Sequence, residues 1–89
     1  MKTIRLIIKG KVQGVFFRAT AKAEADQIGI TGFVKNRNDN SVEIIASGSD
    51  QNLEQFIAWA KKGSPTSIVE KISIEEISEE IFSSFSILK

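Results

Sequence analysis

The spacing of hydrophobic residues changes several times along the chain, and each change predicts a new structural element. Ile4, Leu6 and Ile8 alternate with other residues over Thr3–Gly10, which predicts a β-strand with one buried face. Further strands are predicted over residues 30–37, over residues 42–47, through Ile68, Ile72 and Ile74, and over Phe82–Leu88. We expect the three isoleucines of the fourth strand to share one face.

Two segments instead show helical spacing. A helix is predicted over residues 17–28, with Gly29 ending it, and a second over residues 51–62, capped by Ser49 or Asp50 and ended by Gly63. The apolar positions on one face are Phe17, Ala21, Ala25 and Ile28 in the first helix and Leu53, Phe56, Ile57 and Ala60 in the second. Each helix therefore has one face to bury.

The resulting order, β-α-β-β-α-β with an extra C-terminal strand, predicts an α+β fold. We expect a ferredoxin-like βαββαβ sandwich, an antiparallel sheet with two helices on one face, formed by a single domain of residues 1–89. The right-handed crossover rule makes the first and second strands parallel, with the third able to fit between them. Their C-terminal ends then meet at one edge of the sheet.

Composition restricts the chemistry available to this fold. The chain has no Cys and no His, which excludes disulfides, thiolate nucleophiles, Ser-His pairs and most transition-metal sites. No carboxylate pair has a spacing that favours acid–base catalysis. The apolar runs are too short to span a membrane, and the N-terminal residues resemble a strand rather than a signal peptide. We therefore expect a cytoplasmic protein with no membrane association.

Charge is unevenly distributed along the sequence. Residues 1–40 contain eight Lys and Arg against three Asp and Glu, whereas residues 41–89 contain four against eight. This favours an anionic ligand near the N-terminal half, although solvated lysines on strand edges would give the same counts.

One stretch of the basic half has features of an anion site. Gly14 allows close approach of the backbone, a helix start supplies unpaired N–H groups, and Arg18 adds a charge with a planar fork of donors. By itself this pattern also fits an ordinary turn with an exposed arginine. Asn36 alone likewise fits an ordinary asparagine at a strand end.

The full string Gly10-x-Val12-Gln13-Gly14-Val15-x-Phe17-Arg18 resembles the signature of the acylphosphatase family. The resemblance continues through Gly32-Phe33-Val34-Lys35-Asn36 and ends at Phe85-x-Ile87, so it covers essentially the whole chain. Two departures are Asn40, where the family often has Gly, and Ala19, where it often has a polar or aromatic residue. We expect the turn at Asn40 to survive, because Asn tolerates positive φ.

The resemblance implies an enzyme, an acylphosphatase that hydrolyses acyl phosphates to a carboxylate and inorganic phosphate, without a metal, a cofactor or a phosphoenzyme. It implies two catalytic residues, Arg18 to bind the phosphate group and Asn36 to orient the attacking water. The phosphate-binding residues it implies are Gln13, Gly14, Val15, Phe16, Phe17 and Arg18. The expected partners are the small acyl phosphate and inorganic phosphate, and the expected state is a monomer.

Two alternatives have the same fold. One is a non-catalytic, phosphate-sensing or regulatory domain of the same family. The other is an RNA-binding βαββαβ module, which stacks bases on aromatic residues of its central strands. The first and third predicted strands of this chain carry no aromatic residue, which disfavours RNA binding.

Overall fold

The structure is a computed structural model that describes residues 1–89. All of the predicted elements are present, with both helices within one residue of their expected bounds. They are β1 (Lys2–Lys11), α1 (Phe17–Ile28), β2 (Thr31–Asn36), β3 (Val42–Gly48), α2 (Asp50–Lys62), β4 (Ile68–Ile77) and β5 (Phe85–Ile87). Neither helix has the length and apolar composition needed to cross a membrane.

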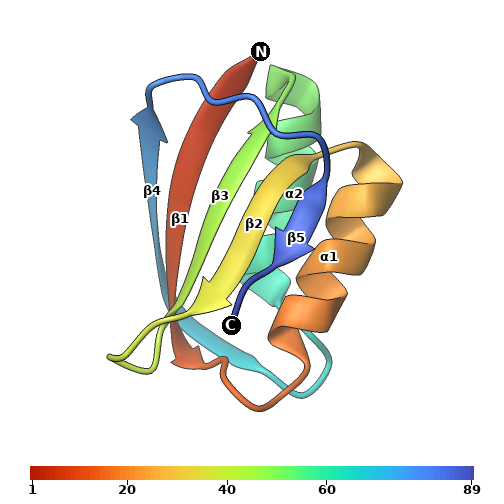
Figure 1. Ribbon diagram of the computed structural model, residues 1–89. Coiled ribbons are helices and arrows are strands. Elements are labelled where there is room, and N and C mark those ends of the chain that lie inside the picture. The colour runs from red at the N-terminus through yellow and green to blue at the C-terminus, as the bar shows by residue number, and fades with distance from the viewer.

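The strands form one sheet in the order β4-β1-β3-β2-β5, with both helices on the same face (Figure 1). β3 lies between β1 and β2 and pairs antiparallel with each, as predicted, and β4 pairs antiparallel with β1. β5 pairs in parallel with β2, which makes the sheet mixed. The ferredoxin-like fold class is therefore confirmed, and the extra C-terminal strand adds one parallel pairing to the expected antiparallel sheet.

The hydrophobic core lies between the sheet and the helices. Ile4, Leu6 and Ile8 are buried on the helix-facing side of β1, as their alternation predicts. An aromatic group closes the core between the helices and β5, with ring centroids 5.2 to 5.9 Å apart. Its members are Phe17, Phe56, Trp59 and Phe85. These offset and tilted contacts fix where α1 begins, because Phe17 is its first residue.

The prediction for β4 was wrong at one residue. Ile68 is 58% exposed and does not share the face of Ile72. The pairing of β1 with β4 shifts between Lys9 and Gly10, so Glu70 is an extra residue in β4. A β-bulge of this kind reverses the alternation, and Val69 takes the core-facing place that strict alternation gave to Ile68.

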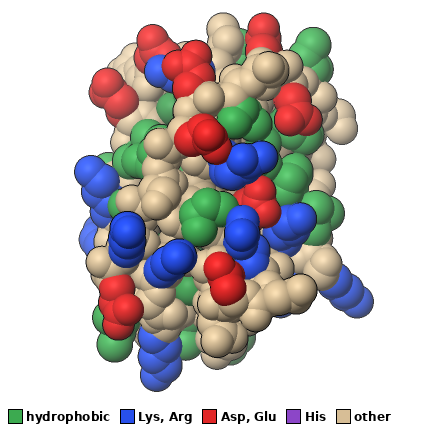
Figure 2. Space-filling view, turned by 90° about the vertical axis from the view of Figure 1, so that its left-hand side faces the viewer, with side chains coloured by type: hydrophobic (Ala, Val, Ile, Leu, Met, Phe, Trp, Pro, Cys, Tyr) green, Lys and Arg blue, Asp and Glu red, His purple; other side chains and the backbone are tan.

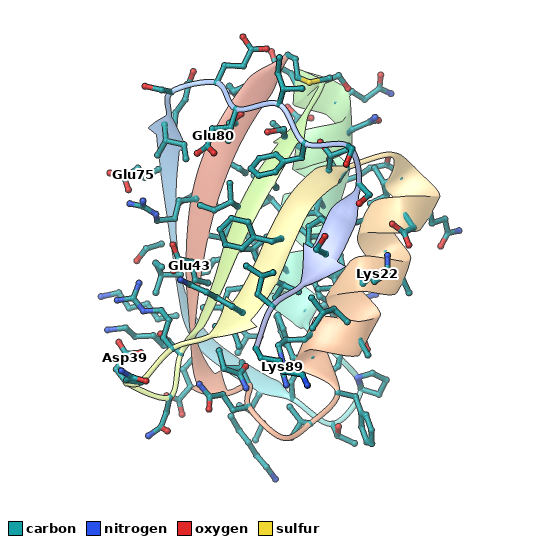
Figure 3. All side chains as sticks on the ribbon, in the orientation of Figure 1. Lys22, Asp39, Glu43, Glu75, Glu80 and Lys89 are labelled. Carbon is teal, nitrogen blue, oxygen red and sulfur yellow. The ribbon has the colours of Figure 1, made fainter.

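The face opposite the helices is partly covered by the connection from β4 to β5, which crosses the sheet from one edge to the other (Figures 1 and 3). Thr3 and Ser47, both buried, hydrogen-bond to each other at 2.7 Å beneath it. The backbone N–H of Glu80 donates to Thr3 Oγ1 (2.9 Å), and Ser47 Oγ donates to the carbonyl of Glu80 (3.0 Å). These bonds hold the connection on the sheet and direct the chain to β5.

Gly10 permits the close approach of β1 to β4 at the bulge. Its φ is 133°, and a Cβ there would lie 2.1 Å from the carbonyl oxygen of Ile68. We expect Gly10→Ala to lower the free energy of unfolding by about 2–4 kcal/mol, because the clash is with backbone. Urea denaturation measures this.

The matched control is Gly48→Ala. The added Cβ would meet only the terminal Cδ1 of Ile30, at 2.8 Å, and that side chain can move. We expect this substitution to lower the free energy of unfolding by about 1 kcal/mol or less. Equal losses of unfolding free energy in Gly10→Ala and Gly48→Ala would show that the bulge does not require glycine.

Candidate active site

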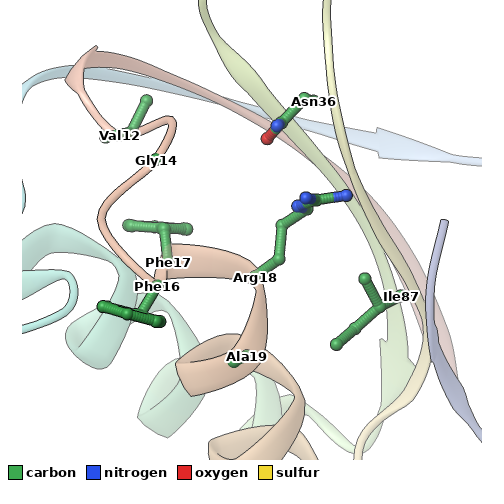
Figure 4. Close-up of a pocket in the computed structure, with 8 residues that line it drawn as sticks. All are labelled: Val12, Gly14, Phe16, Phe17, Arg18, Ala19, Asn36 and Ile87. Atoms are coloured by element: carbon green, nitrogen blue, oxygen red, sulfur yellow. The ribbon is translucent and has the colours of Figure 1, made fainter. Parts of the chain in front are cut away.

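A cavity of about 310 Å³ opens at the edge of the sheet where β1 and β2 end (Figure 4). Its walls come from the loop between β1 and α1, the first turn of α1, the last residue of β2, and β5. The lining residues are Val12, Gly14, Phe16, Phe17, Arg18, Ala19, Asn36 and Ile87. The expected meeting of Arg18 and Asn36 at one sheet edge is therefore observed.

The backbone of the loop has the shape of an anion cradle. Gly14 (φ 73°) and Phe16 (φ 62°) have positive φ, whereas Val15 between them does not. Such alternation points successive N–H groups to one side, and the N–H groups of residues 13–16 donate to no other backbone group. For a bulky residue such as Phe16, the left-handed conformation costs about 1–3 kcal/mol. The surrounding contacts must therefore stabilise it.

Two contacts anchor the middle of this loop. Val15 is buried, and its carbonyl accepts hydrogen bonds from Ser64 Oγ (2.8 Å) and Thr66 Oγ1 (3.0 Å). Both hydroxyls come from the connection between α2 and β4. Because these two hydroxyls hold its carbonyl, the Val15 peptide is fixed in orientation.

Gln13 connects the loop to the turn between β2 and β3. Its side-chain amide donates to the carbonyls of Arg37 (2.8 Å) and Ser41 (2.9 Å). Arg37 directly follows Asn36, so these bonds set the distance between the loop and the end of β2. Nothing in the sequence pattern indicated this use of the Gln13 side chain.

Arg18 extends from the first turn of α1 across the cavity, and its guanidinium group lies close to Asn36 (Figure 4). Arg18 Nη1 donates to the carbonyl of Leu88 at 2.9 Å. Leu88 is itself held by its N–H, which donates to the carbonyl of Val34 on β2 at 2.8 Å. The C-terminal residues thus orient the arginine and leave its other donors free.

Asn36 is the last residue of β2 and points to the same side as the core residue Val34. Its side-chain oxygen is buried and has no hydrogen-bond partner within the chain. A buried carbonyl oxygen without a partner costs about 1–3 kcal/mol, so Asn36 carries an unsatisfied acceptor at the cavity.

The structure separates the sequence-predicted residues into two groups. Gly14, Phe16, Phe17, Arg18 and Asn36 line the cavity. The side chain of Gln13 turns to the β2–β3 turn and that of Val15 into the core, so only their backbone N–H groups can take part. Sequence reasoning missed three lining residues, which are Val12, Ala19 and Ile87. Ile87 was placed on a terminal strand, but alternation does not reveal which edge that strand joins.

Basic residues gather at the end of the molecule where the cavity lies, whereas acidic residues predominate at the opposite end (Figure 2). On the open face of the sheet, Arg5, Lys35 and Arg37 all lie within 3.2 to 3.8 Å of the carboxylate of Glu43. Arg5 also pairs with Glu75 (3.0 Å) and Arg37 with Asp39 (3.6 Å), so the charges of this network largely balance one another.

Asp39 shapes the β2–β3 turn, at whose tip it lies (Figure 3). Its carboxylate accepts hydrogen bonds from the hydroxyl and the backbone N–H of Ser41. These two bonds, the hydroxyl's first, lower the pKa of Asp39 below its ordinary value of 3.8. Asn40 follows with φ 71°, which confirms that asparagine takes the positive-φ position of this turn.

The Asp39 hydrogen bonds predict a pH-dependent contribution to stability. Because the pKa is lowered in the folded chain, the contribution is present above the unfolded pKa and is lost as the pH falls through the folded value. We expect Ser41→Ala to raise the pKa of Asp39 towards 3.8, as measured by NMR titration of its carboxyl carbon. An unchanged titration curve for Asp39 would contradict the assignment.

The chain is similar in sequence to known proteins of one family. The acylphosphatase family model matches residues 4–87. The acylphosphatase of Thiobacillus denitrificans is 45% identical over 76 residues, covering 85% of each chain, and that of Shewanella amazonensis is 42% identical over 88 residues, covering 98% of this chain and 97% of its own.

Solved structures agree with the sequence matches. The crystal structure of acylphosphatase from Bacillus subtilis superposes with a TM-score of 0.96 at 44% sequence identity and covers both chains completely. Matches of this extent, together with a cavity formed by the signature loop and Asn36, show that the chain belongs to the acylphosphatase family of hydrolases.

Proposed function

We propose that residues 1–89 act as one catalytic domain that cleaves the bond between phosphorus and the carboxyl oxygen of an acyl phosphate. The products are a carboxylate and inorganic phosphate. The observation that carries the proposal is that the glycine loop, Arg18 and Asn36 line one cavity, with loop N–H groups that have no backbone partner and an Asn36 oxygen that has none within the chain.

The phosphoryl group binds in the loop. The N–H groups of residues 13–17 surround its oxygens, and the first turn of α1 adds the positive end of the helix dipole. Arg18 supplies the formal charge and donates to phosphoryl oxygens while Leu88 holds one of its nitrogens. These donors are fixed before the substrate binds, so they stabilise the charge that shifts during transfer without reorganisation.

Asn36 positions the attacking water. Its side-chain oxygen accepts a hydrogen bond from the water, which turns a lone pair of the water towards phosphorus. A bond forms between the water oxygen and phosphorus as the bond from phosphorus to the acyl oxygen breaks. The carboxylate departs with the electron pair, and both protons of the water end on the phosphate product, which leaves as H2PO4−. Because a carboxylate is a weakly basic leaving group, no general acid is required.

The chain itself supplies the positive charge for this step. The structure contains no group of three or more His, Cys, Asp or Glu residues that could hold a metal ion. Arg18 and the loop N–H groups fill the role that a metal plays in other phosphoryl-transfer enzymes. We therefore propose metal-independent catalysis.

A phosphate-sensing domain would need the loop and Arg18 but not a water site. The buried oxygen of Asn36 has no hydrogen-bond partner within the chain, and Asn36 lines the same cavity as the loop and Arg18. This observation favours hydrolysis over sensing.

Arg18→Ala and Asn36→Ala test the two assigned roles. We expect each to lower kcat/KM for benzoyl phosphate by at least about 100-fold, because each removes a preorganised group that acts in the transition state. Only Arg18→Ala should also weaken competitive inhibition by inorganic phosphate. Initial rates in the presence of a chelator should match those without it.

The controls are Arg37→Ala and Asn38→Ala, which remove the same side chains from exposed positions outside the cavity. We expect both to keep kcat/KM within about threefold of the wild type. Full activity in Arg18→Ala and Asn36→Ala would refute the mechanism, and dependence on an added metal would refute metal independence.

Gln13 offers a test of loop positioning. Gln13→Met keeps the length of the side chain and removes both hydrogen bonds to the β2–β3 turn. We expect kcat to fall about tenfold, because the loop and Asn36 lose their fixed separation, while the free energy of unfolding falls by only about 1 kcal/mol. Steady-state kinetics and urea denaturation measure the two effects, and a loss confined to stability would contradict a positioning role.

A further inference from the structure

One peptide of the loop between β1 and α1 is held by a part of the chain that lies outside the cavity. The carbonyl of Val15 accepts hydrogen bonds from Ser64 Oγ (2.8 Å) and from Thr66 Oγ1 (3.0 Å), and Ser64 is buried. Both residues belong to the connection from α2 to β4, which passes beside the loop (Figure 1), and neither lines the cavity. A carbonyl oxygen has two lone pairs, so these two hydroxyls use its whole capacity to accept hydrogen bonds.

The orientation of this carbonyl fixes the orientation of the next N–H group. The peptide bond between Val15 and Phe16 is trans, and in a planar trans peptide the C=O and N–H groups point in opposite directions. Because the carbonyl is held at the α2–β4 connection, the N–H of Phe16 points away from that connection. This N–H has no backbone acceptor, and Phe16 lines the cavity.

The backbone conformation of Phe16 opposes this orientation. Phe16 has φ 62° and ψ 22°, a left-handed conformation that a residue with a Cβ adopts only with strain. Rotation of the Val15–Phe16 peptide by half a turn would bring φ of Phe16 to about −120°, which L residues adopt readily. The local energetics of Phe16 therefore favour the flipped peptide, and interactions from elsewhere must hold the observed one.

The flipped peptide would be unsuited to an anion. The carbonyl oxygen of Val15 would then point where the N–H of Phe16 points now, so the loop would lose a donor and gain a partial negative charge that repels phosphoryl oxygens. We infer that Ser64 and Thr66 are positioning residues, which form a hydroxyl lock that keeps the Val15–Phe16 peptide in the orientation that binds the phosphoryl group. The inference rests on the proposed function, in which the N–H of Phe16 donates to a phosphoryl oxygen.

The hydroxyl lock acts on the population of the binding-competent loop and not on the chemical step. When only a fraction of the molecules has the competent loop, the apparent affinity for every phosphoryl ligand falls by that fraction, whereas saturating substrate restores the competent loop. We expect Ser64→Ala/Thr66→Val to raise KM for benzoyl phosphate and Ki for inorganic phosphate by the same factor, about tenfold, with kcat within about threefold of the wild type.

Phe16→Gly provides a rescue, because glycine adopts positive and negative φ about equally well. Added to Ser64→Ala/Thr66→Val, it removes the strain that drives the flip and should bring Ki for inorganic phosphate to within about threefold of Phe16→Gly alone. Inorganic phosphate is the probe, since it has no acyl group that could contact the Phe16 ring.

Thr20→Val is the matched control for the loss of a hydroxyl beside the loop. Thr20 Oγ1 donates to the carbonyl of Phe16 at 2.9 Å, but the backbone N–H of Thr20 holds the same carbonyl. This variant should leave KM, Ki and kcat as in the wild type. If Ser64→Ala/Thr66→Val does not fold, Thr66→Val alone, at an exposed position, should raise Ki about threefold.

NMR titration with inorganic phosphate gives a readout besides activity. The amide signal of Phe16 should shift in the wild type, and Ser64→Ala/Thr66→Val should need about tenfold more phosphate for the same shift. A wild type that neither hydrolyses benzoyl phosphate nor binds inorganic phosphate would overturn the proposed function. A wild type that does both, with Ki unchanged in the double variant or not lowered there by Phe16→Gly, would overturn only the hydroxyl lock.

Discussion

The pairing of β3 with both β1 and β2 is the constraint on which the site depends. Because β3 is antiparallel to each of its neighbours, β1 and β2 run parallel and end at the same edge of the sheet. The loop after β1 and the last residue of β2 therefore meet although they are far apart in sequence. The cavity opens there beside backbone donors that no strand or helix uses, at the carboxyl ends of strands, where open sheets of other folds place their ligands.

Around this edge, the chain stabilises an unfavourable backbone conformation through contacts from several elements. The left-handed Phe16 lies between the Val15 peptide, which Ser64 and Thr66 hold, and the first turn of α1, which Phe17 anchors in the core. These contacts hold the loop in the conformation that leaves its N–H groups without backbone partners. A preorganised cradle of this kind suits the proposed hydrolysis in an enzyme without His or Cys. The carboxylate is already a good leaving group, so the site needs mainly to position the water and to balance the charge of the phosphoryl group.

Much of this arrangement could be predicted from the sequence, because local patterns encode it. Alternation and helical spacing gave the elements, and the order of the elements gave the sheet and the meeting of Arg18 with Asn36. The exposure of Ile68 could not be predicted, because the bulge at Glu70 arises from how β1 and β4 fit together. The same holds for Ile87 and for the side chain of Gln13, whose partners are set by the tertiary fold. The catalytic roles proposed for Arg18 and Asn36 came from the family resemblance, since neither residue stands out by physical pattern alone.

The contact between Arg18 and the carbonyl of Leu88 has a consequence for folding. The two residues are 70 positions apart, and the strand that carries Leu88 to the site pairs over only three residues. Closing so long a segment costs chain entropy that only the completed sheet recovers. Arg18 gains this contact only when β5 is paired with β2. The geometry of the site therefore depends on the last residues of the chain, far from the signature loop in sequence, and a change that loosens β5 would reach Arg18 without touching the cavity.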